Sequence, residues 1–459
     1  MKKLAAISAV FLSTTGAFAA DRIVLPANVT PLNYDIAVAT DAAHLSFTGS
    51  VKIDVSVKQP TKTITLNAAD MSFGRVSLSG VAGAPKVAFD AKQQTATLTF
   101  PAQIAAGAHT LTIEYRGKIY QQAAGLFALD YETPKGSTRA LFTQFENSDA
   151  RRFVPCWDEP NKKATFTLTA TVPANQMALA NTPIVTTDSL PGGLKRVHFA
   201  KSPKMSSYLL FFGAGDFERV SRKVNGVDIG IVVKRGDTDK AGYALDAASK
   251  ILPFYEDYFG VKYPLPKLDL IAGPGSSQFF GAMENWGAIF YFEHDLEIDA
   301  GTSTESDKRG VYTVVAHEMA HQWFGDLVTM DWWDDLWLNE GFASWMELKA
   351  TDQFHPRMES LDGFHRCQGR RDARRCPCGY ASYRHADPRR AAGQPGVRHD
   401  HLFQRPGGHP HAGELCRRGQ LPRGCAQLHQ GPCLREHGHR RSVARARQDL
   451  STPGHTDRA

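Results

Sequence analysis

Apolar and polar residues alternate in short runs between residues 21 and 218, and turn-forming residues separate the runs. The clearest runs place apolar side chains at every second position: Val51, Ile53, Val55 and Val57; Leu111, Ile113 and Tyr115; and Phe166, Leu168, Ala170 and Val172. A period of two is typical of strands with one buried face, and this succession of strands and turns favours antiparallel neighbours. The pattern therefore predicts an antiparallel β domain over residues 21–218.

The pattern changes after residue 218, where helical and strand-like segments follow one another up to residue 361. A helix is expected from Asp239 to Gly260, where the glycine ends it, with a kink at Pro253. Short apolar runs at residues 268–271 and 288–291 predict strands. Apolar residues return at helical spacing before residue 317 and again after residue 340, so two further helices are expected there. The chain is therefore predicted to be an α+β protein with more than one domain.

The last two expected helices carry a candidate metal site. His317 and His321 are one helical turn apart, so both imidazoles lie on one face of their helix. Glu340 follows after eighteen intervening residues, at the start of the next helix. Two imidazole nitrogens and one carboxylate oxygen make a three-ligand zinc site whose open position holds water, and zinc lowers the pKa of that water to near neutrality. Glu318 lies about 100° round the helix from His317, where it can face the water as a general base.

These residues predict a zinc hydrolase, and the alternative is an ordinary amphipathic helix with two surface histidines. A motif of this length occurs by chance in roughly one chain in a hundred of this size. Val311, Val314 and Val315 precede the motif at helical spacing, which favours a buried helix. The linker of residues 325–337 is long enough to turn the chain back, so that Glu340 can reach the same metal. The context therefore favours the metal site.

A second motif, G-A-M-E-N at residues 281–285, narrows the predicted reaction. It lies between a glycine-rich loop at 273–277 and the strand expected at 288–291, so a substrate backbone could pair with this edge as an added strand. Glu284 would then place a negative charge near the metal. A carboxylate there suits the α-amino group of a peptide, which is cationic near neutral pH, and a peptide held by its first residue is cut by an exopeptidase. Taken alone, Glu284 is more simply a solvated loop acid.

The three motifs H-E-x-x-H, N-E-G and G-A-M-E-N together resemble the aminopeptidase N family of zinc metallopeptidases. Further matches run from about Leu25 to Met358 and include T-Q-F-E at residues 143–146, P-C-W-D-E-P at 155–160 and K-M-S-S-Y-L at 204–209. The resemblance implies roles for eight residues: zinc ligands His317, His321 and Glu340; the base Glu318; Glu284 and Glu146 for the substrate amine; and backbone contacts from Gly281 and Ala282. Without the resemblance, Glu146 would be interpreted as a surface acid at a strand end.

The same resemblance implies that residues 219–361 form the front half of a thermolysin-like zinc catalytic domain, over which a further helical domain closes. Family members also use a tyrosine, some eighty-odd residues after the first zinc histidine, to stabilise charge on the carbonyl oxygen. The corresponding window here, roughly His399 to Arg405, contains no tyrosine. We therefore expect the 459-residue chain to be inactive or unstable, although its parent gene encodes an active aminopeptidase.

The composition changes abruptly near Asp362. Residues 1–361 hold 34 lysines and arginines and 39 acidic residues, a net charge of −5, whereas residues 362–459 hold 19 arginines, no lysine and 8 acidic residues, a net charge of +11. The tail also lacks Ile, Met, Trp and Asn, and its few apolar groups predict disorder. A frameshift near Gly363, natural or a sequencing error, is our hypothesis for this change, and sequencing the gene tests it.

Three functional interpretations of the tail are less favoured. Its cysteines and histidines could bind a metal, but no two cysteines have C-x-x-C spacing. Its arginines could bind nucleic acid, but no aromatic residues interleave with them, so no nucleic-acid partner is expected. Its cysteines could form disulfides, but they lack a compact spacing pattern. Cys156 lies far from the other cysteines and is expected to be a free, structural thiol.

Residues 1–20 have the pattern of a bacterial signal peptide. Lys2 and Lys3 supply positive charge, residues 4–12 an apolar core, and A-F-A at 17–19 a cleavage pattern. The apolar run is too short for a membrane span, and the cleavage pattern argues against the alternative of a retained anchor. We therefore expect a protein exported to the periplasm or the cell exterior, without stable membrane insertion.

The leading functional hypothesis is a zinc-dependent aminopeptidase whose partners are peptides with a free N-terminus. One alternative is a zinc endopeptidase or another hydrolase on the same metal site. Another is a non-catalytic remnant that keeps zinc and binds peptides without cleaving them. Glu284 and Glu146 distinguish the first two, because an endopeptidase has no amine to hold.

Overall fold

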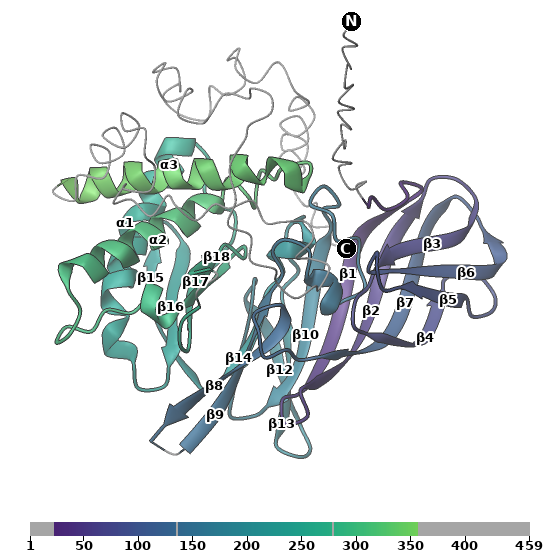
Figure 1. Cartoon of the computed structure of the whole chain (residues 1–459), viewed down its shortest axis with the longest axis horizontal. Coiled ribbons are helices and arrows are strands. Elements are labelled where there is room, and N and C mark those ends of the chain that lie inside the picture. The colour runs from purple at the N-terminus through teal and green to yellow at the C-terminus, as the bar shows by residue number, and fades with distance from the viewer. Residues whose placement is uncertain (1–22, 135, 278–279, 357–459) are drawn as a thin grey trace, which may run out of the picture.

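The computed structural model of the chain describes residues 23–134, 136–277 and 280–356 (Figure 1). The expected signal peptide and the tail from residue 362 lie outside these ranges, as does the window in which a catalytic tyrosine was sought. Strands make up the N-terminal part of the described chain, and the three α-helices come after them in sequence. The α+β class, with a β-rich N-terminal part followed by a mixed α/β part, is therefore confirmed.

The N-terminal part is built on a seven-stranded sheet with the strand order β12-β13-β10-β1-β2-β7-β4. A three-stranded sheet, β3-β6-β5, accompanies it. The strands of these two sheets are β1 (Val29–Asp41), β2 (Ser46–Val57), β3 (Thr61–Asn67), β4 (Ser72–Leu78), β5 (Lys86–Asp90), β6 (Thr95–Ile104), β7 (Gly107–Lys118), β10 (Thr165–Pro173), β12 (Ile184–Leu190) and β13 (Leu194–Phe199).

The alternating runs of the sequence form three of the central strands of the large sheet. Val51 and Ile53 of β2, Leu111 of β7 and Ala170 of β10 have no exposed surface, while the residues between them are at least partly accessible. The period of two therefore did identify the buried faces of these strands, because successive side chains point to opposite sides of a sheet.

The expectation of a purely antiparallel domain is wrong at one strand pair. β1 and β10 are parallel, with Ile36 opposite Leu168. Two strands joined by a tight turn must be antiparallel, but β1 and β10 are not joined in this way. The chain forms β2 to β9 between them, so the direction in which β10 enters the sheet is not set by a hairpin.

A four-stranded sheet, in the order β11-β14-β9-β8, connects the N-terminal part to the mixed part. It consists of β8 (Gly125–Thr133), β9 (Gly136–Gln144), β11 (Met177–Ala180) and β14 (Phe212–Gly215). Phe142 on β9 packs against Phe290 of the following sheet, with ring centroids 5.0 Å apart. Cys156, which follows β9 in the sequence, is buried, and its thiol is free as expected.

The mixed part contains a five-stranded sheet with the order β15-β16-β17-β19-β18. Its strands are β15 (Phe217–Val224), β16 (Val227–Lys234), β17 (Lys267–Gly273), β18 (Ala282–Met283) and β19 (Ala288–Phe292). The strands predicted at residues 268–271 and 288–291 are β17 and β19, which are parallel to each other. The expected domain boundary between residues 218 and 219 lies within β15.

Three α-helices pack near this sheet: α1 (Gly242–Phe259), α2 (Glu305–His321) and α3 (Leu336–Phe354). Five short 3-10 helices also occur in the described ranges: η1 (Ala150–Arg152), η2 (Ser207–Leu209), η3 (Thr238–Lys240), η4 (Glu293–Asp295) and η5 (Trp333–Asp335). Helix α1 runs through Pro253 and ends at Gly260, whose φ of 66° is the left-handed conformation that glycine favours. Across the described ranges, none of the helices combines the length and the apolarity that a bilayer crossing needs.

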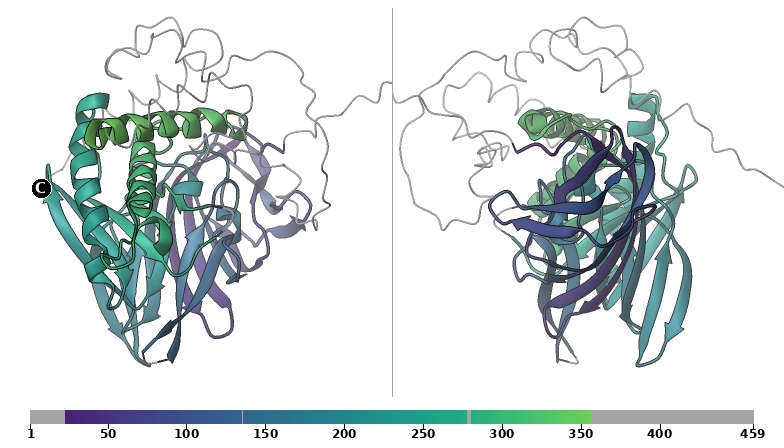
Figure 2. Two further views of the ribbon diagram at one scale, coloured as in Figure 1. Left: turned by 60° about the vertical axis from the view of Figure 1, so that its left-hand side comes forward. Right: turned by 90° about the vertical axis from the view of Figure 1, so that its right-hand side faces the viewer.

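One buried tyrosine joins the three α-helices. The hydroxyl of Tyr255 on α1 lies 2.9 Å from the carbonyl oxygen of Ala316 on α2 and 3.1 Å from that of Met346 on α3. Figure 2 shows α3 passing across α2, with α1 beside them. Where α2 and α3 cross, the C-terminal end of α2 lies beside the first turns of α3. The candidate ligands His317, His321 and Glu340 lie at this point.

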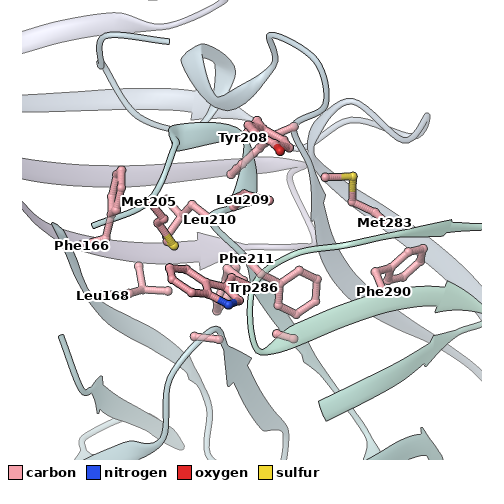
Figure 3. Close-up of a cluster of buried hydrophobic side chains, with 14 of the residues drawn as sticks. Phe166, Leu168, Met205, Tyr208, Leu209, Leu210, Phe211, Met283, Trp286 and Phe290 are labelled. Carbon is pink, nitrogen blue, oxygen red and sulfur yellow. The ribbon is translucent and has the colours of Figure 1, made fainter. Parts of the chain in front are cut away.

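The N-terminal part also packs against β18 and the residues that connect it to β19. Figure 3 shows Met283, Trp286 and Phe290 packed in one apolar cluster with residues of the N-terminal part, namely Phe166, Leu168, Met205, Tyr208, Leu209, Leu210 and Phe211. Asn181 adds polar bonds, because its Nδ2 donates to the carbonyl oxygens of Leu209 at 2.7 Å and Trp286 at 3.0 Å. The segment that follows β18 is therefore fixed by packing and by hydrogen bonds.

Candidate metal centre

The structure brings the three predicted metal ligands together. His317 and His321 lie one turn apart on α2, and their Nε2 atoms are 3.1 Å from each other. Glu340, near the start of α3, places its Oε2 atom 3.3 Å from Nε2 of His317 and 3.6 Å from Nε2 of His321. Helix α2 begins with a reciprocal bond between Thr304 and Asp307, and the spacing of its two histidines at its C-terminal end places both imidazoles on one face.

The spacing of these three atoms fits a zinc ion. Two ligands about 2.05 Å from a tetrahedral ion lie about 3.3 Å apart, because the angle between their bonds is about 109°. The observed separations of 3.1, 3.3 and 3.6 Å bracket that distance. Two imidazole nitrogens and one carboxylate oxygen are also a ligand set that catalytic zinc uses. The three residues would therefore hold zinc without rearrangement of their backbones.

The opposite nitrogen of each imidazole is occupied by hydrogen-bond acceptors. Nδ1 of His317 lies 3.1 Å from Oε2 of Glu347. Nδ1 of His321 lies 2.9 Å from the carbonyl oxygen of Phe324 and 2.9 Å from Oδ1 of Asn339. Because these partners accept, each Nδ1 donates to them, and Nε2 is the nitrogen that faces the shared point.

Burial and mutual charge shift the pKa values of the ligands in opposite directions. Burial acts to lower the pKa of His317, but bonds to Glu340 and Glu347 outweigh it and raise that pKa to about 10. Burial acts to raise the pKa of Glu340, but His321 and His317 outweigh it and hold that pKa well below its usual range. A metal ion therefore competes with protons at the histidines, and binding releases them.

Glu318 lies between the two histidines on α2 and is only 7% exposed. Burial raises the pKa of its carboxyl group to about 8, with the two histidines opposing the shift and Glu284 adding to it. A carboxyl group that titrates near neutral pH can accept a proton in one step and return it in the next. The residue predicted as the base is therefore in an environment that suits proton transfer.

Two further carboxylates, of Glu146 and Glu284, lie beside the proposed ligands and come from segments outside α2 and α3. Glu284 follows β18 and is 2% exposed, and Glu146 follows β9. One carboxylate oxygen each from Glu146, Glu284 and Glu340 lies within 4.8 Å of the others. Burial raises the pKa of Glu146 well above its usual range, and the charge of Glu284 adds to the shift. This concentration of negative charge would stabilise a cationic group bound beside the metal.

Gly281 and Ala282, the two predicted backbone contacts, lie at the edge of a sheet. β18 is the last strand of the five-stranded sheet, and it pairs with β19 so that Ala282 is opposite Tyr291. The carbonyl oxygen of Gly281 accepts a bond of 3.0 Å from the backbone nitrogen of Phe292. An edge strand can accept an extended peptide as one more strand, and Glu284 lies just beyond the end of this one.

The structure adds residues that the sequence analysis did not single out. Gln322 binds the turn after β18, since its Nε2 donates to the carbonyl oxygen of Glu284 at 3.0 Å and its Oε1 accepts from the nitrogen of Gly287 at 3.1 Å. Nδ2 of Asn339 donates to Oε1 of Glu284 at 3.2 Å. Gln322 and Asn339 are direct neighbours of predicted ligands, so a search for polar residues beside the motifs would have found them.

Asp326 is a further residue without a sequence signal. It has no exposed surface, and neither of its carboxylate oxygens has a hydrogen-bond partner among the described residues. Its backbone carbonyl accepts a bond of 3.0 Å from Nζ of Lys163, which comes from the N-terminal part. The hydroxyl of Tyr208, from the same part, lies 3.3 Å from the carbonyl oxygen of Gly325. The link between α2 and α3 is therefore held by the N-terminal part.

Comparison with protein families gives two matches that together cover most of the described chain. The family described as the Peptidase M1 N-terminal domain matches residues 30–209. The family described as the Peptidase family M1 domain matches residues 243–375, which include α2, α3 and all of α1 except Gly242. The two matches occur in the order in which the β-rich and the mixed parts of the chain follow each other.

Curated relatives carry aminopeptidase names. "Aminopeptidase N" from Acetobacter pasteurianus is 48% identical over 326 residues, which are 70% of this chain and 90% of that protein. "Endoplasmic reticulum aminopeptidase 1" from Homo sapiens is 40% identical over 353 residues, which are 75% of this chain and 37% of that protein. "Aminopeptidase M1" from Arabidopsis thaliana is 40% identical over 340 residues, 72% of this chain and 38% of that protein. The chain thus spans little more than a third of the human and plant relatives.

Proposed function

The chain belongs to peptidase family M1, and from this membership we propose that it is a zinc-dependent aminopeptidase that removes the first residue of peptides. One observation carries the proposal. Two imidazoles and a carboxylate converge within bonding distance of one point, and two more carboxylates, of Glu146 and Glu284, lie beside that point at the end of an edge strand. The first group suits a hydrolytic metal, and the second suits the amine of a peptide's first residue.

His317, His321 and Glu340 would hold the zinc ion. Zinc in such a site polarises the carbonyl group of the scissile bond and acidifies water. Glu318 accepts a proton from the attacking water and then donates it to the leaving amine. Burial raises the pKa of Glu318 to about 8, and a positive charge bound nearby lowers that pKa, which favours the ionised form that the first step needs.

Glu284 and Glu146 set which bond is cut. Their carboxylates pair with the α-ammonium group of the substrate, and the edge of β18 offers backbone groups from Gly281 and Ala282 to the residues that follow. A peptide held in this way can place only its first peptide bond over the metal. Holding the reacting groups in one geometry can itself supply several kcal/mol of the barrier reduction, about 7–11 kcal/mol in the best cases.

Three assays on one preparation separate this proposal from its alternatives. Zinc content, hydrolysis of an aminoacyl amide and hydrolysis of the N-acetylated amide are measured together. An aminopeptidase binds zinc and cleaves only the free amine, an endopeptidase also cleaves blocked peptides, and a non-catalytic remnant binds zinc and cleaves neither. We expect a chain continued after Leu361 in the frame of the family to bind zinc and to cleave only the free amine. Cleavage of the blocked substrate at a comparable rate would contradict the proposal.

We also propose that the protein is exported, on the strength of its N-terminal pattern of two lysines, an apolar core and A-F-A at 17–19. These residues lie outside the described ranges. Expression in a Gram-negative host followed by fractionation and N-terminal sequencing tests the proposal. The expected result is a periplasmic protein that begins near Ala20 or Asp21, whereas a cytoplasmic protein that retains Met1 would contradict it.

A further inference from the structure

Asn339 contacts the metal site and the amine site with opposite ends of one side-chain amide. Its Oδ1 lies 2.9 Å from Nδ1 of the proposed ligand His321. Its Nδ2 lies 3.2 Å from Oε1 of Glu284, the proposed partner of the substrate amine. The residue itself is only 4% exposed, and it directly precedes the third proposed ligand, Glu340.

The orientation of this amide is determined by its surroundings. Glu284 offers carboxylate oxygens, which accept when ionised, so the Asn339 nitrogen has to face it. His321 has two oxygen atoms near Nδ1, from Asn339 and from the backbone of Phe324, so Nδ1 has to be the donor. Both requirements are met by the same orientation. The arrangement therefore forms a chain of hydrogen bonds in which Nδ1 of His321 donates to Asn339, and Asn339 donates to Glu284.

We propose that Asn339 is a positioning residue that couples the proposed metal site to the proposed amine site through this chain. The inference rests on the proposed function, because it assigns Glu284 and His321 the roles given above. The bond that Asn339 donates to Glu284 polarises its amide and makes Oδ1 a better acceptor, because bonds in such a chain strengthen one another. A better acceptor on Nδ1 makes Nε2 of His321 a more basic metal ligand and fixes the plane of its ring.

A second link supports the same coupling. Gln322 directly follows His321 on α2, and its side chain donates to the backbone carbonyl of Glu284 while accepting from the backbone of Gly287. Gln322 fixes where the Glu284 backbone lies, and Asn339 fixes where its carboxylate points. The distance between the metal and the amine carboxylate is therefore set by side chains that belong to the two metal-bearing helices.

The test is a double-mutant cycle in zinc affinity, which does not depend on catalysis. The dissociation constant for zinc is measured by competition with a chromophoric chelator in the full chain, in Asn339→Leu, in Glu284→Leu and in the double variant. Asn339→Leu is expected to weaken zinc binding about 10- to 100-fold, the usual effect of removing a residue that orients a ligand. Glu284→Leu alone is expected to weaken zinc binding about tenfold, but in the Asn339→Leu background by no more than about threefold, because the chain of bonds is already broken.

Direct attraction between Glu284 and zinc gives the opposite result. In that case Glu284→Leu has the same effect in both backgrounds, and such additivity would overturn the proposed coupling while leaving the zinc site intact. A change of less than about twofold in Asn339→Leu would overturn it as well. If the unaltered chain binds no zinc at all, the metal site itself fails and the proposed function fails with it, so the two failures are distinguishable.

A second variant keeps the test decisive if Asn339→Leu does not fold, which circular dichroism reports. Asn339→Asp retains an oxygen that accepts from His321 but has no N–H to donate to Glu284. In this background, Glu284→Leu is therefore expected to change zinc affinity by no more than about threefold. A tenfold effect of Glu284→Leu in this background would overturn the proposal. Asn225→Asp is the matched control, because Nδ2 of Asn225 donates to Oε2 of Glu256 at 2.7 Å in a site that contains none of the proposed ligands. Its zinc affinity is expected to be unchanged.

Discussion

At the scale of single residues, the chemistry of the site depends on carboxyl groups with different surroundings. Glu340 is paired with two imidazoles and stays ionised, whereas the pKa of Glu318 is raised to about 8 chiefly by burial. One carboxylate is therefore suited to hold a cation and the other to exchange a proton. The same physical reasoning applies outside the site, where the largely buried side chain of Glu297 in the mixed part makes stability depend on pH.

Glu318→Gln tests the assignment of the base. The amide has almost the same shape as the carboxylate but cannot accept a proton, so zinc should remain bound while turnover falls by about 10²- to 10⁴-fold or more. The measurement combines zinc analysis with a kcat determination on a chain continued in the family's reading frame. Substantial activity in this variant, at full zinc content, would refute the role of Glu318 as the base.

Glu297 provides a prediction about stability and pH. Burial, together with Asp237 and Glu293, raises its pKa to about 7, while Lys240 and Lys234 oppose the shift. Its Oε1 is buried and has no hydrogen-bond partner within residues 23–356 as described. The folded chain therefore holds a proton that the unfolded chain has lost, and the contribution of Glu297 to stability falls as the pH rises from its ordinary pKa to about 7.

The variant Glu297→Gln removes this titration. The difference in free energy of unfolding, Glu297→Gln minus the unaltered chain, should be larger at pH 8 than at pH 4 by about 1 kcal/mol or more, after allowance for solvent screening. Urea denaturation of both proteins at several pH values, with chelator present, measures the difference. A difference that is the same at every pH would show that Glu297 does not titrate in this window.

At the scale of elements, the site depends on how α2 and α3 cross. Each helix was predictable from its apolar spacing, and the ligand roles followed from the motifs. Their relative placement was not predictable, because it depends on Tyr255 of α1, Lys163 of the N-terminal part and the packing of Trp286, which lie far apart in the sequence. The parallel pairing of β1 with β10 was missed for a similar reason, since local alternation reports a buried face but not the direction of a neighbour.

Tyr255→Phe tests the link between the helices. The change removes one hydroxyl that bonds to backbone carbonyls on both α2 and α3, and should lower the free energy of unfolding by about 1–2 kcal/mol. Because the two helices carry all three proposed ligands, zinc affinity should also fall. Tyr243→Phe on the same helix is the control, since the Tyr243 hydroxyl has no hydrogen bond within the described part of the chain. Equal effects of the two changes on unfolding would contradict the account.

At the scale of the whole molecule, the four-stranded sheet, the five-stranded sheet and helix α3 each place a carboxylate at one site. Glu146 comes from the end of β9, Glu284 from the end of β18 and Glu340 from α3, so no single segment could have shown that their oxygens lie within 4.8 Å. The sequence supported Glu284 weakly and Glu146 only through resemblance, because an isolated acid carries no sign of its neighbours. Of the three proposed ligands, the two histidines were predictable because helical periodicity places them on one face of α2.

The reading frame beyond Leu361 is the other question at this scale. We propose that the change of composition near Gly363 results from a frameshift, which the loss of five residue types supports. Resequencing the gene around codons 358–366 tests the proposal. If a shift of one or two bases restores family-like sequence after Leu361, the proposal stands, and if neither does, it fails.

The central claim is that His317, His321 and Glu340 form one zinc site, and metal stoichiometry tests it most directly. The purified chain is dialysed against zinc, freed of loosely bound ions and analysed by elemental mass spectrometry beside His321→Ala and a surface control, His44→Ala. We predict one zinc ion per chain in the unaltered protein and in the control, and none in His321→Ala, with removal of zinc lowering the melting temperature of the first two only. A chain without stoichiometric zinc, or a His321→Ala variant that keeps it, would contradict the account.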